Sequence, residues 1–212
     1  MSLILNDVSI QLGTNPPLFK PLSLTIARGE TVTVMGPSGV GKSTLLDAVA
    51  GLLAPEFTLR GSITLDGVDL RPLPAEARRI GVMFQEAVLF PHLSVGDNLA
   101  FGLRPDIKGR KARRAAVEEA LETAGLAGVY ARDPANLSGG QRARAALMRT
   151  LLAAPKAVLL DEPFSKLDPE LRDGIREFTF AHIRKSAIPA LLVTHDAADA
   201  DAAGGAVIHL KD

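Results

Sequence analysis

Glycine, lysine and hydroxyl residues are combined in one short segment, 36–44, in a pattern that can hold a phosphate group. The segment consists of Gly36, Pro37, Ser38, Gly39, Val40, Gly41, Lys42, Ser43 and Thr44, and it matches G-x-x-x-x-G-K-[ST]. Glycines let backbone N–H groups turn toward phosphate oxygens, and the N-terminus of a following helix adds its dipole. Lys42 can reach the β- and γ-phosphates of a nucleoside triphosphate, and the Ser43 hydroxyl can bind Mg²⁺. The alternative is a chance glycine-rich turn, which the expected strand before the segment and helix after it disfavour.

Two adjacent acids, Asp161 and Glu162, follow an apolar run later in the chain. The run Val158–Leu160 is typical of a buried strand, and α/β proteins bind ligands at the carboxyl ends of such strands. Asp161 is suited to Mg²⁺, directly or through water, and Glu162 can polarise an attacking water. Standing alone, the two acids could be helix caps or surface residues. The phosphate-binding pattern elsewhere in the chain favours the catalytic interpretation.

A second segment rich in small residues opens another expected helix, at Leu137, Ser138, Gly139, Gly140 and Gln141. Backbone N–H groups at a helix N-terminus can bind an anion. The alternative is an ordinary serine N-cap followed by flexible glycines. Two phosphate-binding segments on one chain suggest an arrangement in which each nucleotide is held by both, from two different molecules.

The elements that must position these segments alternate between strands and helices. Strands are expected at 31–35, 80–84, 157–160, 190–193 and 206–210, and helices at 43–53, at 138–154 and after Asp168. In the helix after Asp168, the residues Leu171, Ile175 and Phe178 are expected to face inward. This alternation predicts an α/β fold with a mainly parallel core sheet.

Two further regions are expected to have a different character. Segments 8–12 and 22–26 alternate apolar with polar residues, and Asp66-Gly67 is a hairpin turn, so an N-terminal antiparallel β-subdomain is predicted. Residues 94–132 are expected to form an inserted helical subdomain that begins with a Ser94–Asp97 capping box, while 1–93 and 133–212 form the ATP-binding core of one domain. The basic run 108–114 is interpreted as a solvated helix face rather than a phosphate-binding patch, because glutamates follow it.

Composition excludes several other classes of protein. Lys+Arg and Asp+Glu both total 24, so the formal net charge of zero does not favour a nucleic-acid or anionic-membrane footprint. The chain has no cysteine, which excludes disulfides and thiolate metal sites and is compatible with a reducing cytoplasm. No signal peptide is expected from the first residues, and no apolar stretch approaches the ~20 residues of a membrane helix. A membrane role would therefore need a partner that supplies the spans.

Taken in order, these motifs resemble the nucleotide-binding subunit of ATP-binding cassette (ABC) transporters, with a likeness that runs along essentially the whole chain. The resemblance implies a P-loop NTPase fold with ATP and Mg²⁺ as ligands. It identifies 36–44 as the Walker A loop, 137–141 as the signature, and Asp161 and Glu162 as the Walker B pair, with Glu162 as catalytic base. It also implies that Gln85 senses the γ-phosphate and metal, that His195 contacts the γ-phosphate, and that Asp168 closes a loop crossing a dimer interface.

The resemblance further implies the partners and the place of action. The segment 84–101 is more similar to importer than to exporter cassettes. A head-to-tail dimer on the cytoplasmic face of the cell membrane is implied, with integral membrane permease subunits, a possible solute-binding protein and no nucleic acid. The permease is expected to dock near 85–101, where Leu89 and Phe90 are taken to be exposed.

The chain departs from the family pattern at the adenine. Leu12 stands where the family usually places an aromatic ring that stacks on adenine, while Phe19 aligns better with a core position. Two other functions remain open at this point. A non-transport ABC ATPase of the DNA-repair or translation-factor type would share the ATP motifs, but usually carries coiled-coil insertions, a second cassette or a basic surface. A P-loop kinase is disfavoured by the signature and by Glu162 beside Asp161.

Overall fold

The structure is a computed structural model that describes residues 1–211. Contacts between residues divide it into two compact units. The first contains Met1–Val82, Lys156–Glu162 and the chain from Phe180 onward, and the second contains Met83–Pro155 and Pro163–Thr179. None of the helices within residues 1–211 combines the length and apolar character that crossing a bilayer requires.

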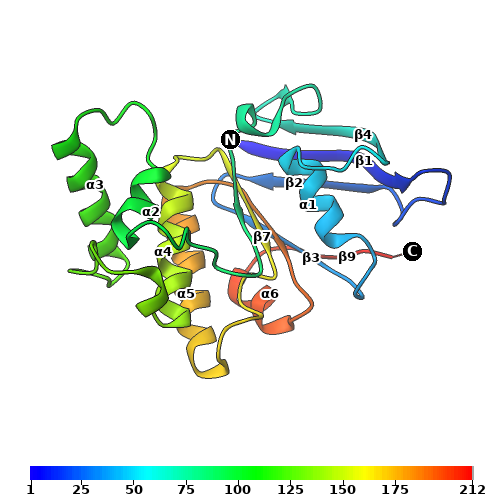
Figure 1. Cartoon of the computed structure of the whole chain (residues 1–212). Helices are drawn as coiled ribbons and strands as arrows, with labels where there is room; N and C mark the ends of the chain where they lie inside the picture. Colours follow the sequence, from blue (N-terminus) through cyan, green and yellow to red (C-terminus); the bar gives the residue numbers. More distant parts are fainter. Residues whose placement is uncertain (212) are drawn as a thin grey trace. The chain divides into compact units, whose positions relative to one another are not determined.

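An antiparallel sheet of four strands forms one part of the first unit, with the order β2-β1-β4-β5. These strands span β1 Ser2–Leu12, β2 Leu22–Ala27, β4 Phe57–Leu65 and β5 Val68–Asp69, and Figure 1 shows β1, β2 and β4 lying side by side. Alternate residues of β2 are buried, as the apolar–polar alternation predicts. β4 and β5 pair around Asp66-Gly67, so the expected hairpin and antiparallel subdomain are confirmed.

A bulge bends this sheet where β1 passes Gly61. The register between β1 and β4 shifts between Asn6 and Ser9, and Gly61 has φ +84°. A Cβ at Gly61 would lie 2.3 Å from the backbone oxygen of Asp7, so only glycine fits at this position.

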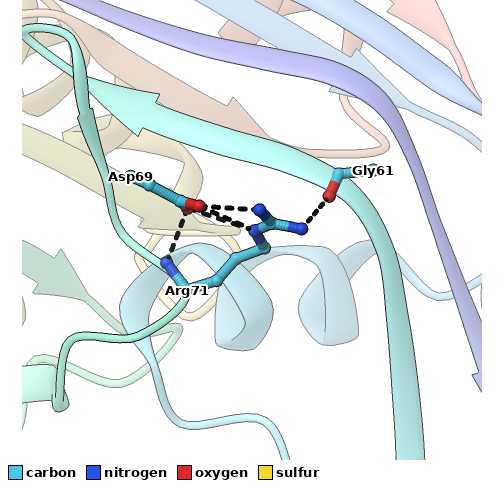
Figure 2. Close-up of polar contacts among 3 residues, drawn as sticks. All are labelled: Gly61, Asp69 and Arg71. Atoms are coloured by element: carbon cyan, nitrogen blue, oxygen red, sulfur yellow. Dashed lines mark hydrogen bonds and ion pairs between the residues drawn. The ribbon is translucent and has the colours of Figure 1, made fainter.

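Asp69 and Arg71 form an exposed ion pair, and Arg71 also donates a hydrogen bond to Gly61 (Figure 2). Arg71 Nη2 lies 2.7 Å from Asp69 Oδ2, and Arg71 Nη1 donates to the Gly61 carbonyl over 2.6 Å. The side-chain hydrogen bonds from Arg71, followed by its backbone N–H, lower the pKa of Asp69 to about 2. Because both side chains are exposed, the pair fixes local geometry more than it stabilises the fold.

The second sheet of the first unit has five strands in the order β6-β7-β8-β3-β9. Its strands are β3 Thr31–Met35, β6 Ile80–Met83, β7 Ala157–Asp161, β8 Ala190–Val193 and β9 Val207–His209. Pairing is parallel between β3 and β8, between β3 and β9 and between β7 and β8, which confirms the predicted parallel core. Val34 and Asp161 both pair with Val193, so the loops that follow β3, β7 and β8 leave the sheet at one edge. The carboxyl ends of these strands therefore position the segment 36–44, the acids Asp161 and Glu162, and His195.

Helix α1, Lys42–Ala50, follows β3 and ends at a buried arginine. The Arg78 side chain is 7% exposed and comes from the segment between the short 3₁₀ turn η1, Ala75–Ala77, and β6. Its Nη1 donates to the Ala48 and Val49 carbonyls over 2.7 and 2.9 Å, and its Nε donates to Leu73 over 2.9 Å. The last carbonyls of α1, which no helical N–H can reach, are thereby paired. Helix α6, Ala197–Ala203, also belongs to this unit and was not expected from the sequence.

The second unit is mainly helical. It contains α2 Val95–Phe101, α3 Arg110–Thr123, the 3₁₀ turn η2 Pro134–Asn136, α4 Gly139–Leu152 and the first part of α5, which spans Pro169–Ser186. One apolar stripe of α3 and its C-terminal end is buried in a shared apolar core: Val117, Ala120, Leu121 and Ala124. The Ser94 hydroxyl caps α2 by accepting the Asp97 N–H, as its sequence predicts.

One expectation for α5 is wrong. Ile175 is buried and Phe178 packs against the core of the second unit, but the Leu171 side chain is 39% exposed. Leu171 lies only two residues after the start of α5, and it approaches the edge of α4 at Gly140 instead of entering the core. Helical spacing identified the right stripe but not where along the helix the core begins.

Candidate nucleotide-binding site

The segment 36–44 forms a turn between β3 and α1, the local structure that its sequence predicts. Gly41 is the N-cap of α1 with φ +96°, and no side chain caps the helix. A Cβ on Gly41 would lie 3.0 Å from Leu18 Cδ1, so both its conformation and its surroundings favour glycine. The first turn of α1 also lacks acidic residues. The helix therefore presents unpaired N–H groups and its positive dipole end to an anion.

Lys42 lies folded against this turn. Its side chain is 6% exposed, and its Nζ donates to the Gly36 and Pro37 carbonyls, over 2.9 Å in each case. A buried lysine needs such partners because desolvation penalises its charge. The two carbonyls hold the ammonium group inside the curve of the turn, where a phosphate bound by the N–H groups would meet it.

Ser43 and Asp161 bring two oxygen donors together at the edge of the parallel sheet. The Ser43 hydroxyl donates to Asp161 Oδ1 over 3.2 Å. Burial raises the pKa of Asp161; the charge of Glu162 adds to the rise, and the Ser43 hydrogen bond and Lys42 oppose it. Burial also raises the pKa of Asp47, one helical turn after Ser43, and the charge of Asp161 contributes. Because burial and neighbouring negative charge disfavour the ionised carboxylates, a cation beside Asp161 would stabilise them.

The donor set at this place suits a hard divalent ion that is only partly held by protein. Hydroxyl and carboxylate oxygens are the ligands that Mg²⁺ prefers, and Mg²⁺ usually keeps water and phosphate oxygens as well. Within residues 1–211, no three His, Asp or Glu side chains cluster closely enough to hold a metal by themselves. A cation at Ser43 and Asp161 would thus need oxygens from a nucleotide.

Glu162 and His195 face each other beside this pair. The Glu162 backbone has φ +44°, which is strained for a residue other than glycine, and its N–H donates to the Val193 carbonyl over 2.9 Å. His195 Nδ1 lies 3.1 Å from Glu162 Oε1. The imidazole is 60% exposed and the carboxylate 21%, so both can meet a ligand. Strained residues of this kind cluster at active sites.

In the second unit, Ser138 and Gln141 cap α4 reciprocally. The Ser138 hydroxyl accepts the Gln141 N–H over 3.2 Å, and the Gln141 side chain accepts the Ser138 N–H over 3.0 Å. The ordinary capping role considered for this segment is therefore present. Gly140 lies against Ile175 and Leu171 of α5, at ordinary packing distance.

Gln85, Gly139 and the segment before Asp168 lie around one cavity of ≈ 410 Å³. Its lining includes Arg142, Lys166 and Leu167. Arg172 holds the last segment in place, because its Nε donates to the Leu167 carbonyl over 3.0 Å. Asp168 itself is exposed and directly precedes α5. Three segments far apart in sequence are thus gathered within the second unit.

The expected exposure of Leu89 and Phe90 is wrong. Leu89 is 7% exposed and packs in the core of the second unit. Asn98, itself fully buried, accepts the Phe90 N–H over 2.7 Å and donates to the Phe90 carbonyl over 3.1 Å. This clamp turns Leu89 inward, and the exposed large apolar side chains within 85–101 are instead Val88, at 56%, and Phe101, at 70%.

The start of the chain also bears on the base of a nucleotide. Leu12 ends β1 and is 37% exposed, whereas Phe19 is 1% exposed and belongs to the core, as its sequence position predicts. Leu18 is half-buried against Gly41. Near the P-loop, the described part of this segment offers aliphatic rather than aromatic surface.

Comparison with known proteins decides the family. The family described as ABC transporter matches residues 19–165 of the chain. This chain belongs to the ABC transporter family of ATP-binding proteins. It is an ABC ATPase, as the signature at 137–141 predicts together with the P-loop at 36–44 and the acids after β7.

Relatives of this ABC ATPase cover most of its length. The ABC transporter ATP-binding protein YnjD of Escherichia coli K12 is 49% identical over 200 residues, which cover 94% of this chain and 91% of YnjD. The thiamine import ATP-binding protein ThiQ of the same organism is 42% identical over 178 residues, covering 84% of this chain and 75% of ThiQ. The Fe(3+) ions import ATP-binding protein FbpC of Rhizobium etli is 43% identical over 191 residues, covering 90% of this chain and 53% of FbpC.

The sequence analysis missed one buried hydrogen-bonded pair in this ABC ATPase, Thr194 and Asp199. Asp199 is 3% exposed and accepts a hydrogen bond from the Thr194 hydroxyl. The available signal was an acid three residues after an N-cap candidate, Asp196, which is the spacing of a first helical turn. Without an expected helix at 197–203, that spacing had no structural meaning.

Proposed function

We propose that this ABC ATPase drives the uptake of a solute through a separate membrane permease, from the cytoplasmic face of the membrane. The observation that carries the proposal is the joint placement of Lys42, Ser43, Asp161, Glu162 and His195 at one edge of the parallel sheet. Its direction rests on ThiQ and FbpC, which are named as import proteins. The permease supplies the membrane-spanning helices.

The triphosphate binds at the N-terminus of α1. Its β- and γ-phosphate oxygens accept hydrogen bonds from the backbone of Gly39–Ser43, and Lys42 neutralises part of their charge. Ser43 and Asp161 hold Mg²⁺, and Gln85 contributes to its coordination and senses the γ-phosphate. When bound, Mg²⁺ supplies further charge neutralisation on the same oxygens.

Glu162 acts as the general base for hydrolysis. A water oxygen attacks the γ-phosphorus, its proton passes to the Glu162 carboxylate, and the bond from the γ-phosphorus to the β–γ bridging oxygen breaks to leave ADP. His195 steadies Glu162 through the 3.1 Å contact of Nδ1 with Oε1. A neutral imidazole carries one N–H. If the Nδ1–H donates to Glu162, Nε2 can donate to a γ-phosphate oxygen only in the imidazolium form.

A second copy of the chain completes each site in a head-to-tail dimer. Ser138–Gln141 and Asp168 of one molecule approach the ATP held by the other, which makes two equivalent sites around a twofold axis. Support comes from the Ser138 cap, which fixes the α4 N-terminus so that the Gly139 and Gly140 N–H groups point along the helix axis. Residues 94–132 act as the helical subdomain of one ABC ATPase domain, whose core is 1–93 and 133–212. The exposed side chains of Val88 and Phe101 form the permease-facing surface.

Glu162→Gln tests the catalytic proposal. An amide cannot accept the proton, so steady-state ATP turnover should fall by roughly 10²–10⁴-fold while MgATP binding persists. Turnover is measured by phosphate release and binding by equilibrium titration. Glu56→Gln, at an exposed position of the first unit, is the matched control and should keep wild-type turnover. Near-normal turnover of Glu162→Gln would remove the base role from this residue.

A further inference from the structure

A buried hydroxyl–carboxylate pair lies directly beside His195. The Thr194 side chain is 1% exposed and Asp199, in the first turn of α6, is 3% exposed. Thr194 Oγ1 lies 2.6 Å from Asp199 Oδ2 and also accepts the Asp196 N–H over 3.0 Å. Since the hydroxyl has one proton and accepts from Asp196, it must donate that proton to the Asp199 carboxylate. The bond is therefore charge-assisted and stronger than one between neutral groups.

These bonds fix the backbone on both sides of His195. The Thr194 N–H donates to the Val34 carbonyl over 3.3 Å, in the strand that leads into the P-loop. On the other side, the Asp196 carboxylate accepts the Ala198 N–H and caps α6. The imidazole, in contrast, is 60% exposed, and its contact is with Glu162. An exposed ring is thus carried on a backbone that is held at residues 194 and 196.

We propose that Thr194 and Asp199 are positioning residues for ATP hydrolysis, which hold the backbone of His195 so that its ring meets Glu162 and the γ-phosphate. The inference rests on the proposed function of His195. A shift of about 1 Å in a catalytic group can reduce turnover by about 10²-fold, so a small loss of backbone order at 194–196 is enough to matter. Asp199 acts through Thr194, and Thr194 acts through His195.

The competing explanation is purely structural. Asp199 in the first turn of α6 would stabilise that short helix through its dipole and would do so without reference to His195. Both explanations predict some loss of stability when the pair is broken. They differ in whether the loss of turnover depends on the histidine, and a double-mutant cycle measures that dependence.

The experiment uses the full chain, varies MgATP from below KM to saturation, and measures kcat and KM at a temperature where circular dichroism shows each variant folded. Thr194→Val removes the hydroxyl at nearly constant volume, and kcat should fall by about 10–10²-fold with KM for ATP changed less than about threefold. Thr194→Ser keeps the hydroxyl and should restore most of kcat. Thr33→Val is the matched control, because Thr33 is fully buried in the neighbouring strand β3 and its hydroxyl has no hydrogen-bond partner among the described residues. It should leave kcat unchanged.

The same change is then made in a His195→Ala background. If Thr194 acts through His195, adding Thr194→Val should reduce kcat by less than about twofold, since the group that it positions is already absent. A full second loss, multiplying that of His195→Ala, would overturn the inference and leave the ATPase proposal intact. Wild-type turnover in His195→Ala would overturn it as well. Glu162→Gln provides the separate check, because its failure to reduce turnover contradicts the proposed function itself.

Discussion

Replacing Arg78 with methionine should destabilise the first unit strongly, although its hydrogen bonds go to the end of α1 and to Leu73 and not to the proposed catalytic residues. The guanidinium is 7% exposed and donates to three carbonyls, those of Ala48, Val49 and Leu73. Methionine fills most of the volume of the side-chain stem but leaves these oxygens without a donor. Each buried acceptor left unpaired costs ~1–3 kcal/mol. The desolvation of Arg78, which lowers its pKa, is relieved by the change and offsets part of this cost. The net loss should be about 3 kcal/mol.

Urea unfolding followed by circular dichroism measures the effect. With a urea m-value of ~1–3 kcal/mol/M, a loss of about 3 kcal/mol lowers the midpoint by at least about 1 M. Arg78→Lys should give an intermediate loss, because a single ammonium cannot bridge the α1 carbonyls and Leu73 as a planar guanidinium does. Arg60→Met, at an exposed position of β4, is the matched control and should shift the midpoint little. A midpoint for Arg78→Met equal to that of Arg60→Met would refute the capping argument.

Three further predictions concern ligands and partners. The Glu162→Gln protein should elute from a sizing column as a dimer with MgATP and as a monomer without it, and adding Ser138→Arg should abolish the dimer while ATP still binds; a dimer that survives this change contradicts a role for Ser138 across the interface. With Leu12 in place of an aromatic ring, titration should show ATP preferred over GTP by less than about a hundredfold, or ~2.7 kcal/mol; a larger preference means that another residue recognises adenine. Val88→Glu or Phe101→Glu should reduce transport with the permease but leave ATP binding intact, whereas unchanged transport in both variants would place docking elsewhere.

Local patterns predicted most of the elements because each has a physical cause within a few residues. The β-branched run 31–35 became β3 at its expected bounds, and Ser138 and Ser94 cap the helices that they were expected to begin. Parallel strands 157–160 and 190–193 were recognisable because they are apolar without interruption, which is typical of strands buried on both faces. Motif spacing and strand order together then place Asp161 and His195 at the edge where the P-loop begins.

The features that could not be predicted depend on contacts between distant residues. Leu89 is turned inward by the two hydrogen bonds between Asn98 and the Phe90 backbone, and no periodicity in 84–93 reveals that clamp. Similarly, no local pattern around Arg78 indicates that its side chain is buried and bound to the end of α1. The first half of β4 was missed because Gly61 interrupts its alternation, and only the bulge in β1 explains why a glycine is needed there.

Within the second unit, one arginine connects the exposed apolar surface to the helix that carries the signature. Arg149, near the end of α4, donates to the Val88 carbonyl over 2.9 Å and lies 5.3 Å over the Phe90 ring, which in turn packs edge-on against Phe101 at 4.9 Å. Desolvation lowers the pKa of Arg149, so the guanidinium is held in this contact at an electrostatic cost. A partner that presses on Val88 and Phe101 therefore acts on α4 through contiguous contacts, and Ser138 caps the opposite end of the same helix.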